Sequence, residues 1–277
     1  MKKYFFTIIL LFILVATNAQ HQLVKLWETD STLKVPESVL YDGKNKVLYV
    51  TNIDGKEPWG KDGKGSVGKI GLDGKIIAVD WVTGLNAPKG MGLFKNRLYV
   101  ADLTELVVID IMTGKIVERI AVEGAVGLND VSADAKGTVY VSDSKTKSVY
   151  EVKKGKPSLL LDSSKLKGPN GVLRYNGSLY VLDFGSLYKV NEDKSLSKIA
   201  EKMEPSTDGV EHVAGGDFIV STWVGVVYYV SADGTKQVLL DGRERKINSA
   251  DIGYDAARRI VYVPTFWKNS VVAYELK

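Results

Sequence analysis

The chain has 277 residues, a formal net charge of +4 and 45% hydrophobic residues, which is enough for one large folded domain. It contains no cysteine, which excludes disulfides, thiolate nucleophiles and cysteine-ligated metals, and it has only two histidines, His21 and His212. The lysines are scattered over turns and are not gathered in one run, so we expect no nucleic-acid partner.

Residues 1–19 are predicted to be a signal peptide. A basic start at Met1–Lys3 precedes the apolar run Tyr4–Ala16, and Thr17-Asn18-Ala19 offers small residues before a cleavage site at Gln20. The apolar run is too short to span a bilayer comfortably, and no later segment is apolar enough to do so; an uncleaved anchor is the alternative. We therefore expect a periplasmic or secreted product with no membrane contact after cleavage.

Residues 20–277 are predicted to form one domain built from a repeat. Six apolar strands end on a polar residue at intervals of 50, 41, 40, 39 and 43 residues, and these ends are Asn52, Asp102, Asp143, Asp183, Thr222 and Thr265. A period near forty made of strands and turns is typical of propeller blades with four strands each. The fold class is therefore all-β, a six-bladed β-propeller. We expect Leu23–Trp27 to supply the missing fourth strand of the last blade.

One polar residue precedes each of these strand ends by 13 to 15 positions. The six are Glu37, Lys89, Asp130 (or Asn129), Asn170, Asp208 and Asp251. Each opens the first strand of its blade, so radial blades would bring them into one ring around the central channel. The second strand runs antiparallel to the first, and its end returns to the same face.

The loops at that face carry aromatic residues. Trp59 lies in a long insertion between Gly55 and Gly68, and Phe184, Trp223 and Phe266-Trp267 follow later second strands. We predict that they rim the mouth of the channel, with the insertion as a lid. The alternative is that they pack between blades.

Three ring residues could hold a metal ion. Glu37, Asn170 and Asp208 offer two carboxylates and an amide oxygen, a hard-oxygen set suited to Ca²⁺, Mg²⁺ or Mn²⁺. We expected Gly171 and Gly209, which follow two of them, to let the backbone pass close to a bound ion. The alternative is a water-filled channel with polar walls.

Several short motifs resemble the SMP-30/gluconolactonase family of six-bladed propellers across the whole of residues 20–277. They are Val35-Pro-Glu37-Ser-Val with Leu48-Tyr-Val-Thr-Asn52, Gly127-Leu-Asn129-Asp130, Gly168-Pro-Asn170-Gly171 and Thr207-Asp208-Gly209. The resemblance implies one divalent cation held by Glu37, Asn170 and Asp208, with Ca²⁺ first and Mg²⁺, Mn²⁺ or Zn²⁺ as other candidates. It also implies hydrolysis of a lactone or related ester, with Asp208 as the acid/base group.

The resemblance also implies that Asn129 faces the substrate. To it we add the other ring residues and the aromatic rim as predicted substrate-binding residues, which are Lys89, Asp130, Asp251, Trp59, Trp223 and Trp267. The chain departs from sugar-lactone members at two places. Gly127 stands where they carry an arginine, and Ser144-Lys-Thr-Lys147 stands where they carry an acidic residue. An aldonolactone is therefore a poor candidate substrate.

Three classes of function fit these residues. The first is an exported metal-dependent hydrolase of small lactones or esters, and the second is a non-catalytic exported propeller that binds a ligand or partner. The third is other chemistry on this fold, as in strictosidine-synthase-like, paraoxonase-like or quinone-dependent enzymes. The last two would use channel histidines, and His212, which alone could serve, is interpreted as structural. The oligomeric state is left open.

Overall fold

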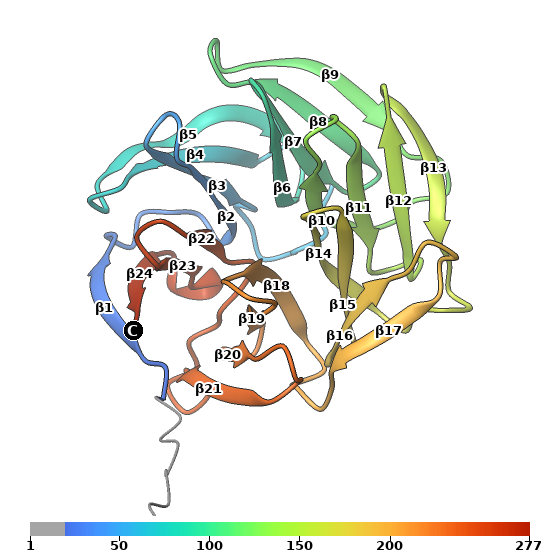
Figure 1. Ribbon diagram of the computed structural model, residues 1–277. Coiled ribbons are helices and arrows are strands. Elements are labelled where there is room, and N and C mark those ends of the chain that lie inside the picture. Colours follow the sequence, from blue (N-terminus) through green and yellow to red (C-terminus); the bar gives the residue numbers. More distant parts are fainter. Residues whose placement is uncertain (1–19) are drawn as a thin grey trace, which may run out of the picture.

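A computed structural model describes residues 20–277, and the predicted signal peptide lies outside them. Six four-stranded antiparallel sheets stand radially around a central axis, as Figure 1 shows, so the prediction of a six-bladed β-propeller is confirmed. In residues 20–277 the helical structure consists of one 3₁₀ turn, η1 (Phe266–Lys268), and no helix there is long and apolar enough to cross a membrane.

The two inner strands of each blade carry the site. The first strands are β2 (Pro36–Asp42), β6 (Pro88–Phe94), β10 (Leu128–Ala133), β14 (Pro169–Tyr175), β18 (Thr207–His212) and β22 (Gly253–Asp255). The second strands are β3 (Val47–Asn52), β7 (Arg97–Asp102), β11 (Val139–Asp143), β15 (Ser178–Asp183), β19 (Phe218–Thr222) and β23 (Ile260–Pro264). Four of these second strands, β11 and β19 among them, contain only buried or nearly buried residues, so they form a rigid support.

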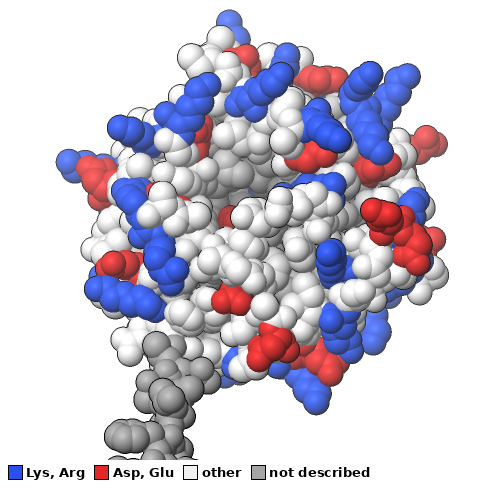
Figure 2. Space-filling model, in the orientation of Figure 1, with Lys and Arg blue, Asp and Glu red and all other residues white. Residues whose placement is uncertain are grey.

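The two outer strands complete each blade. The third strands are β4 (Gly65–Gly71), β8 (Glu105–Asp110), β12 (Ser148–Lys153), β16 (Ser186–Val190), β20 (Val226–Val230) and β24 (Val271–Leu276). The outermost strands are β5 (Ile76–Leu85), β9 (Lys115–Ala121), β13 (Lys156–Leu161), β17 (Leu196–Ala200), β21 (Lys236–Asp241) and β1 (Leu23–Glu28). Figure 2 shows that one face carries Lys and Arg interleaved with Asp and Glu around its circumference and is hollowed near its centre.

The ring is closed by the N-terminal strand, as predicted. β1 pairs antiparallel with β24, with Leu23 opposite Leu276 and Glu28 opposite Val272. The two strands come from opposite ends of residues 20–277 and lie in the same last blade, so their pairing closes the ring. It also covers the edge of β24 that would otherwise be exposed.

The hydrophobic core lies between neighbouring sheets, and each pair of blades shares one cluster. Tyr49 and Val67 of the first blade pack with Leu98 and Val107 of the second. Ile219 of the fifth blade packs in the same way with Val261 of the sixth. Burial of these side chains between sheets holds the inner strands at fixed positions around the channel.

Candidate functional site

The ring residues lie at irregularities in the first strands. In five blades the pairing between first and second strand shifts at the ring position, between Pro36 and Ser38, Pro88 and Met91, Leu128 and Val131, Pro169 and Val172, and Thr207 and Val210. A bulge leaves a residue without a cross-strand partner and re-aims its side chain, and such bulges are common next to active sites. The ring residues therefore leave the regular ladder at the point where they reach the channel.

Hydroxyl groups on three second strands satisfy the backbone at these bulges. Thr51 Oγ1 accepts the N–H of Ser38 at 3.0 Å, and Ser142 Oγ accepts that of Asp130 at 2.9 Å. Ser221 Oγ accepts the N–H of Gly209 at 2.8 Å. A buried N–H without a partner is costly, so these hydroxyls stabilise the irregular strand starts.

The aspartates at the ends of the second strands have a structural role. The Asp102 carboxylate accepts the N–H groups of Asn86 and Ala87, which lead into β6. Asp183 does the same for Lys167 and Gly168 before β14. These carboxylates tie down the loop that enters the first strand of the same blade, which explains why the repeat carries a polar residue there.

The glycines after the ring residues allow neighbouring first strands to approach each other. A Cβ on Gly171 would lie 2.4 Å from the carbonyl oxygen of Asp208, and one on Gly209 would lie 2.5 Å from the backbone nitrogen of Ile252. These two glycines therefore make room for the next blade, and the expectation that they also let the backbone pass close to an ion stays a prediction.

Ten residues line a cavity of about 250 Å³ at the end of the channel where the first strands begin; we call it the mouth pocket. They are Glu37, Pro58, Trp59, Lys89, Asn129, Asn170, Ser206, Asp208, Trp223 and Phe266. The structure thus brings together the three predicted metal ligands and four of the predicted substrate-binding residues. Three of the lining residues are aromatic, and all the others except Pro58 are polar or charged.

Three predicted residues lie elsewhere. Asp130 and Asp251 line a second cavity, the opposite pocket, together with Ser38, Arg174 and Glu211. Trp267 does not line the mouth pocket; it is 45% exposed and packs edge-on against Phe266. The single ring expected from the sequence is therefore divided between two cavities. The bulge in β10 re-aims the side chain of Asp130, whereas Asp251 lies before β22 and contacts Ser38 of the first blade.

The two displaced carboxylates are already used by the backbone and side chains of neighbouring blades. Asp130 accepts the N–H groups of Val131 at 2.6 Å and of Val172, in the next blade, at 2.7 Å. Asp251 accepts the hydroxyl of Ser38 at 2.5 Å. These contacts join blades, so both residues stabilise the fold.

Two of the predicted metal ligands differ from Asp130 and Asp251, because each has a side-chain oxygen that accepts no hydrogen bond from the described residues. Asn170 donates its Nδ2 to Asp208 Oδ1 at 3.0 Å, which leaves Asn170 Oδ1 as an acceptor. Within residues 20–277, Asn170 Oδ1 and Glu37 Oε2 are buried and have no hydrogen-bond partner. Buried oxygens of this kind fit a bound cation, because each would otherwise pay the full cost of desolvation.

The donor set is sparse. Among the described residues, no group of three or more Asp, Glu, His or Cys side chains is placed to hold a metal ion. The mouth pocket supplies two carboxylates and one amide, so a hard cation held there would take further oxygen ligands from water or from a bound molecule.

The carboxyl groups of this set are shifted toward their protonated forms. Burial raises the pKa of Glu37 to about 7, and the charge of Asp251 adds to this while Lys89 opposes it. Burial, together with the charges of Glu37 and Asp251, also raises the pKa of Asp208 well above its usual range. Such shifts are common where carboxyl groups act as acids or bases.

Lys89 places an ammonium group in the same pocket. Its side chain is 2% exposed, and its Nζ donates to the carbonyl oxygen of Pro58 at 2.6 Å. Burial lowers the pKa of Lys89, although the nearby charges of Glu37 and Asp208 act in the opposite direction. Lys89 forms no ion pair within residues 20–277, so it affects both carboxylates through space and not by contact.

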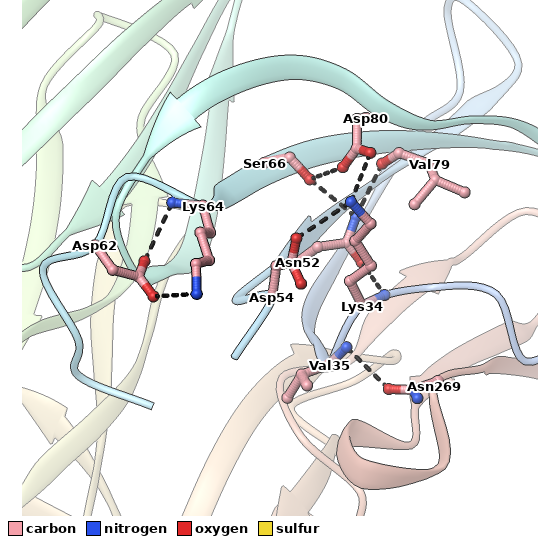
Figure 3. A network of polar contacts seen from close by, with 10 residues as sticks. All are labelled: Lys34, Val35, Asn52, Asp54, Asp62, Lys64, Ser66, Val79, Asp80 and Asn269. Atoms are coloured by element: carbon pink, nitrogen blue, oxygen red, sulfur yellow. Dashed lines mark hydrogen bonds and ion pairs between the residues drawn. The ribbon is translucent and has the colours of Figure 1, made fainter. Parts of the chain in front are cut away.

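The insertion that carries Trp59 leaves the first blade between β3 and β4 and is anchored at its base. Figure 3 shows Lys34 between Asp54 and Asp80, with Nζ distances of 3.1 Å and 2.8 Å. Asn52 Oδ1 accepts the N–H of Lys34 at 3.1 Å in the same network. The stems of the insertion are therefore fixed, which positions its tip over the pocket.

Three apolar residues at this face have a left-handed backbone. Leu103 and Phe184 directly follow second strands, and Phe266 begins the 3₁₀ turn after β23; their φ angles are 58°, 46° and 50°. Bulky residues rarely adopt this conformation, which costs on the order of 1–3 kcal/mol each and is often found at functional sites. At the mouth face, three apolar residues are thus held in a backbone conformation that is energetically unfavourable for them.

Two residues of the mouth pocket were not predicted, and a third was predicted only as part of the aromatic rim. Pro58 and Ser206 carry no motif of their own, and Phe266 was grouped with Trp267. Ser206 Oγ is a buried atom without a partner in the described chain. The sequence feature that could have identified Ser206 is its position directly before Thr207-Asp208, where a bulged strand begins.

Comparisons with known proteins show the fold. No protein-family model matches the chain, and no curated protein matches it by sequence. A solved structure described as a putative gluconolactonase is 17% identical, with a TM-score of 0.68, and the match covers 94% of this chain and 93% of that one. A streptogramin B lyase is 11% identical, with a TM-score of 0.66 and coverage of 93% and 97%.

A third similar structure is a catalytically inactive histidine-to-alanine variant of virginiamycin B lyase from Staphylococcus aureus with quinupristin. It is 11% identical, with a TM-score of 0.64, and the match covers 93% of this chain and 99% of that one. In the present chain neither histidine lines the mouth pocket. His21 stacks on Tyr229, and His212 stacks on Tyr175 with ring centroids 3.8 Å apart in both cases.

Proposed function

We propose that the protein is an exported, metal-dependent hydrolase of lactones or related esters that acts in the mouth pocket. The observation that carries the proposal is the pair of buried, unpartnered oxygens, Glu37 Oε2 and Asn170 Oδ1, beside the Asp208 carboxyl group. The shared fold with a putative gluconolactonase and the family-like motifs support it.

The proposed roles follow from the contacts. Glu37, Asn170 and Asp208 would hold one divalent cation, for which Ca²⁺ is our first candidate and Mg²⁺, Mn²⁺ or Zn²⁺ are others. When bound, such an ion polarises a carbonyl group and stabilises the negative charge that develops on its oxygen. Asp208 is the proposed general base, since its carboxyl group lines the mouth pocket in contact with Asn170 and could take a proton from a water molecule there.

The rest of the pocket would bind and orient the substrate. Trp223 and Phe266 stack edge-on with ring centroids 5.5 Å apart, and together with Trp59 they present an aromatic wall to a ligand. Asn129 is fixed by donating Nδ2 to Ser144 Oγ at 2.9 Å, and it faces the same cavity. This wall favours aryl esters or alkyl lactones over polyhydroxy lactones.

The direct test is a hydrolysis screen on the mature protein, with aryl esters, alkyl lactones and gluconolactone, in the presence of Ca²⁺ or Mn²⁺ and in the presence of chelator. We expect metal-dependent cleavage of aryl esters or alkyl lactones and slow cleavage of gluconolactone. Metal content near one ion per chain and a higher Tm on addition of the ion should accompany activity. Metal-free protein with no Tm response to millimolar ion would contradict the proposal.

A second candidate is a non-catalytic propeller that binds a small ligand. Lys89 favours it, because a buried ammonium group already offsets part of the negative charge that a metal would neutralise. Bound metal without hydrolysis of any ester or lactone would favour this second function.

A further inference from the structure

Two lysines from different blades meet at the ring of Trp59. The Lys89 Nζ of the second blade lies 4.7 Å from the ring centroid, and the Lys145 Nζ of the third blade lies 4.9 Å from it. Lys145 is exposed at the rim, whereas Lys89 is buried in the pocket. Two positive charges therefore lie close to one aromatic side chain that lines the mouth pocket.

Neither ammonium group has a counter-ion in contact. Within residues 20–277, Lys145 and Lys89 take part in no ion pair. The charge of Lys145 also contributes to lowering the pKa of Lys89, so the two groups repel each other. An anion bound near both groups would relieve this repulsion.

The arrangement depends on a glycine. A Cβ on Gly127 would lie 2.3 Å from Cγ of Lys145 and 3.1 Å from Cζ3 of Trp59, so a larger residue would displace both side chains. The backbone around them is fixed by one carboxylate, since Asp143 accepts the N–H groups of Gly127 at 3.2 Å and of Lys145 at 2.9 Å. The position of Lys145 is therefore set by buried structure beneath it.

We propose that Lys145, assisted by Lys89, binds a carboxylate on the ligand of the mouth pocket. The ligand class is then an apolar acid or acid-bearing ester, whose aromatic or alkyl body lies on Trp223 and Phe266 while its carboxylate meets the two ammonium groups. The inference rests on the proposed function in placing the ligand in that pocket. Lys145 is a specificity-determining residue in this scheme.

Binding can be measured without turnover and without metal. We would titrate the metal-free, chelator-treated protein with 4-phenylbutyrate and with its neutral analogue 4-phenylbutyramide, by calorimetry and by tryptophan fluorescence. Chelator removes any direct bond between carboxylate and metal ion, so this result is independent of whether the protein is a metal-dependent hydrolase. A Trp59→Phe variant would assign the fluorescence signal.

The expected result is that the acid binds about tenfold more tightly than the amide, which is the size of one partly exposed charge-assisted contact. In Lys145→Met the two affinities should become equal within about twofold. The matched control is Lys147→Met, an exposed lysine of the same loop, which should keep the preference. The preference should also shrink as salt is raised.

Three outcomes would overturn the inference. They are equal binding of acid and amide by the unmodified protein, binding of neither probe, and a preference for the acid that persists in Lys145→Met. The proposed hydrolase function would survive each of these results if metal-dependent ester cleavage is observed.

Discussion

The two ends of the channel are built from the same first strands, but their carboxyl groups have different partners. At the opposite pocket, Asp130 accepts a hydrogen bond from Val172 of the next blade, and Asp251 accepts one from Ser38 of the first blade. At the mouth pocket, Glu37 Oε2 and Asn170 Oδ1 are buried and accept none from the described chain. A place in the repeat therefore does not separate the proposed metal ligands from the structural carboxylates, whereas their hydrogen bonds do.

The largest expected effect is on turnover. Asp208→Asn keeps an oxygen that could bind a cation but removes the base, so it should lower kcat by about 10²-fold or more while metal affinity changes less. Glu37→Gln should do the reverse, because its proposed role is to hold the ion. Kinetics and metal titration on both variants test the division of roles, and equal effects of the two changes on both quantities would show that it is wrong.

The next largest effect is on stability, at the other end of the channel. Asp130→Ala leaves the buried N–H groups of Val131 and Val172 without an acceptor, at a cost of roughly 1–3 kcal/mol each. We expect a clear loss of free energy of unfolding in urea and an unchanged metal affinity in the protein that remains folded. If the Asp130→Ala protein has normal stability but weaker metal binding, Asp130 has the binding role that we assign to the residues of the mouth pocket.

A smaller effect is expected from Lys89. Lys89→Met removes a positive charge beside the proposed cation site, so affinity for Ca²⁺ should rise by about tenfold, equivalent to ~1.4 kcal/mol of repulsion at short range. Lys89→Arg keeps the charge and is the matched control. Calorimetric titration measures both, and unchanged affinity in the methionine variant would show that no cation binds near Lys89.

The smallest expected effect is a pH dependence from the opposite pocket. Burial, helped by the charge of Asp251, raises the pKa of Glu211 to about 8, so the folded protein keeps a proton that the unfolded chain releases. Stability from this group is therefore complete below about pH 4.5 and is lost as pH rises toward 8.

Glu211→Gln should flatten this part of the profile and raise Tm by a few degrees at pH 8, with little change at pH 5. The exposed Glu123→Gln serves as a control. Differential scanning fluorimetry across this range provides the measurement, and parallel profiles for the variant and the unmodified protein would place the titrating group elsewhere.

The sequence by itself determined the architecture. The strand ends from Asn52 to Thr265 set the number of blades, and Leu23–Trp27 was identifiable as the closing strand because the last blade had only three strands of its own. Period-two alternation and turn residues carry this information locally, so no tertiary contact was needed to recognise it. The same spacing brought Glu37, Asn170 and Asp208 to one end of the channel.

Only the tertiary structure decided which ring residues share a cavity. The bulge at the start of β10 re-aims Asp130 toward the opposite pocket, and a hydrogen bond from Ser38 of the first blade holds Asp251 there. Contacts between blades, such as Lys145 of the third with Trp59 of the first, have no local signature. They depend on the approach of surfaces far apart in sequence, which the pattern of residues along one strand does not encode.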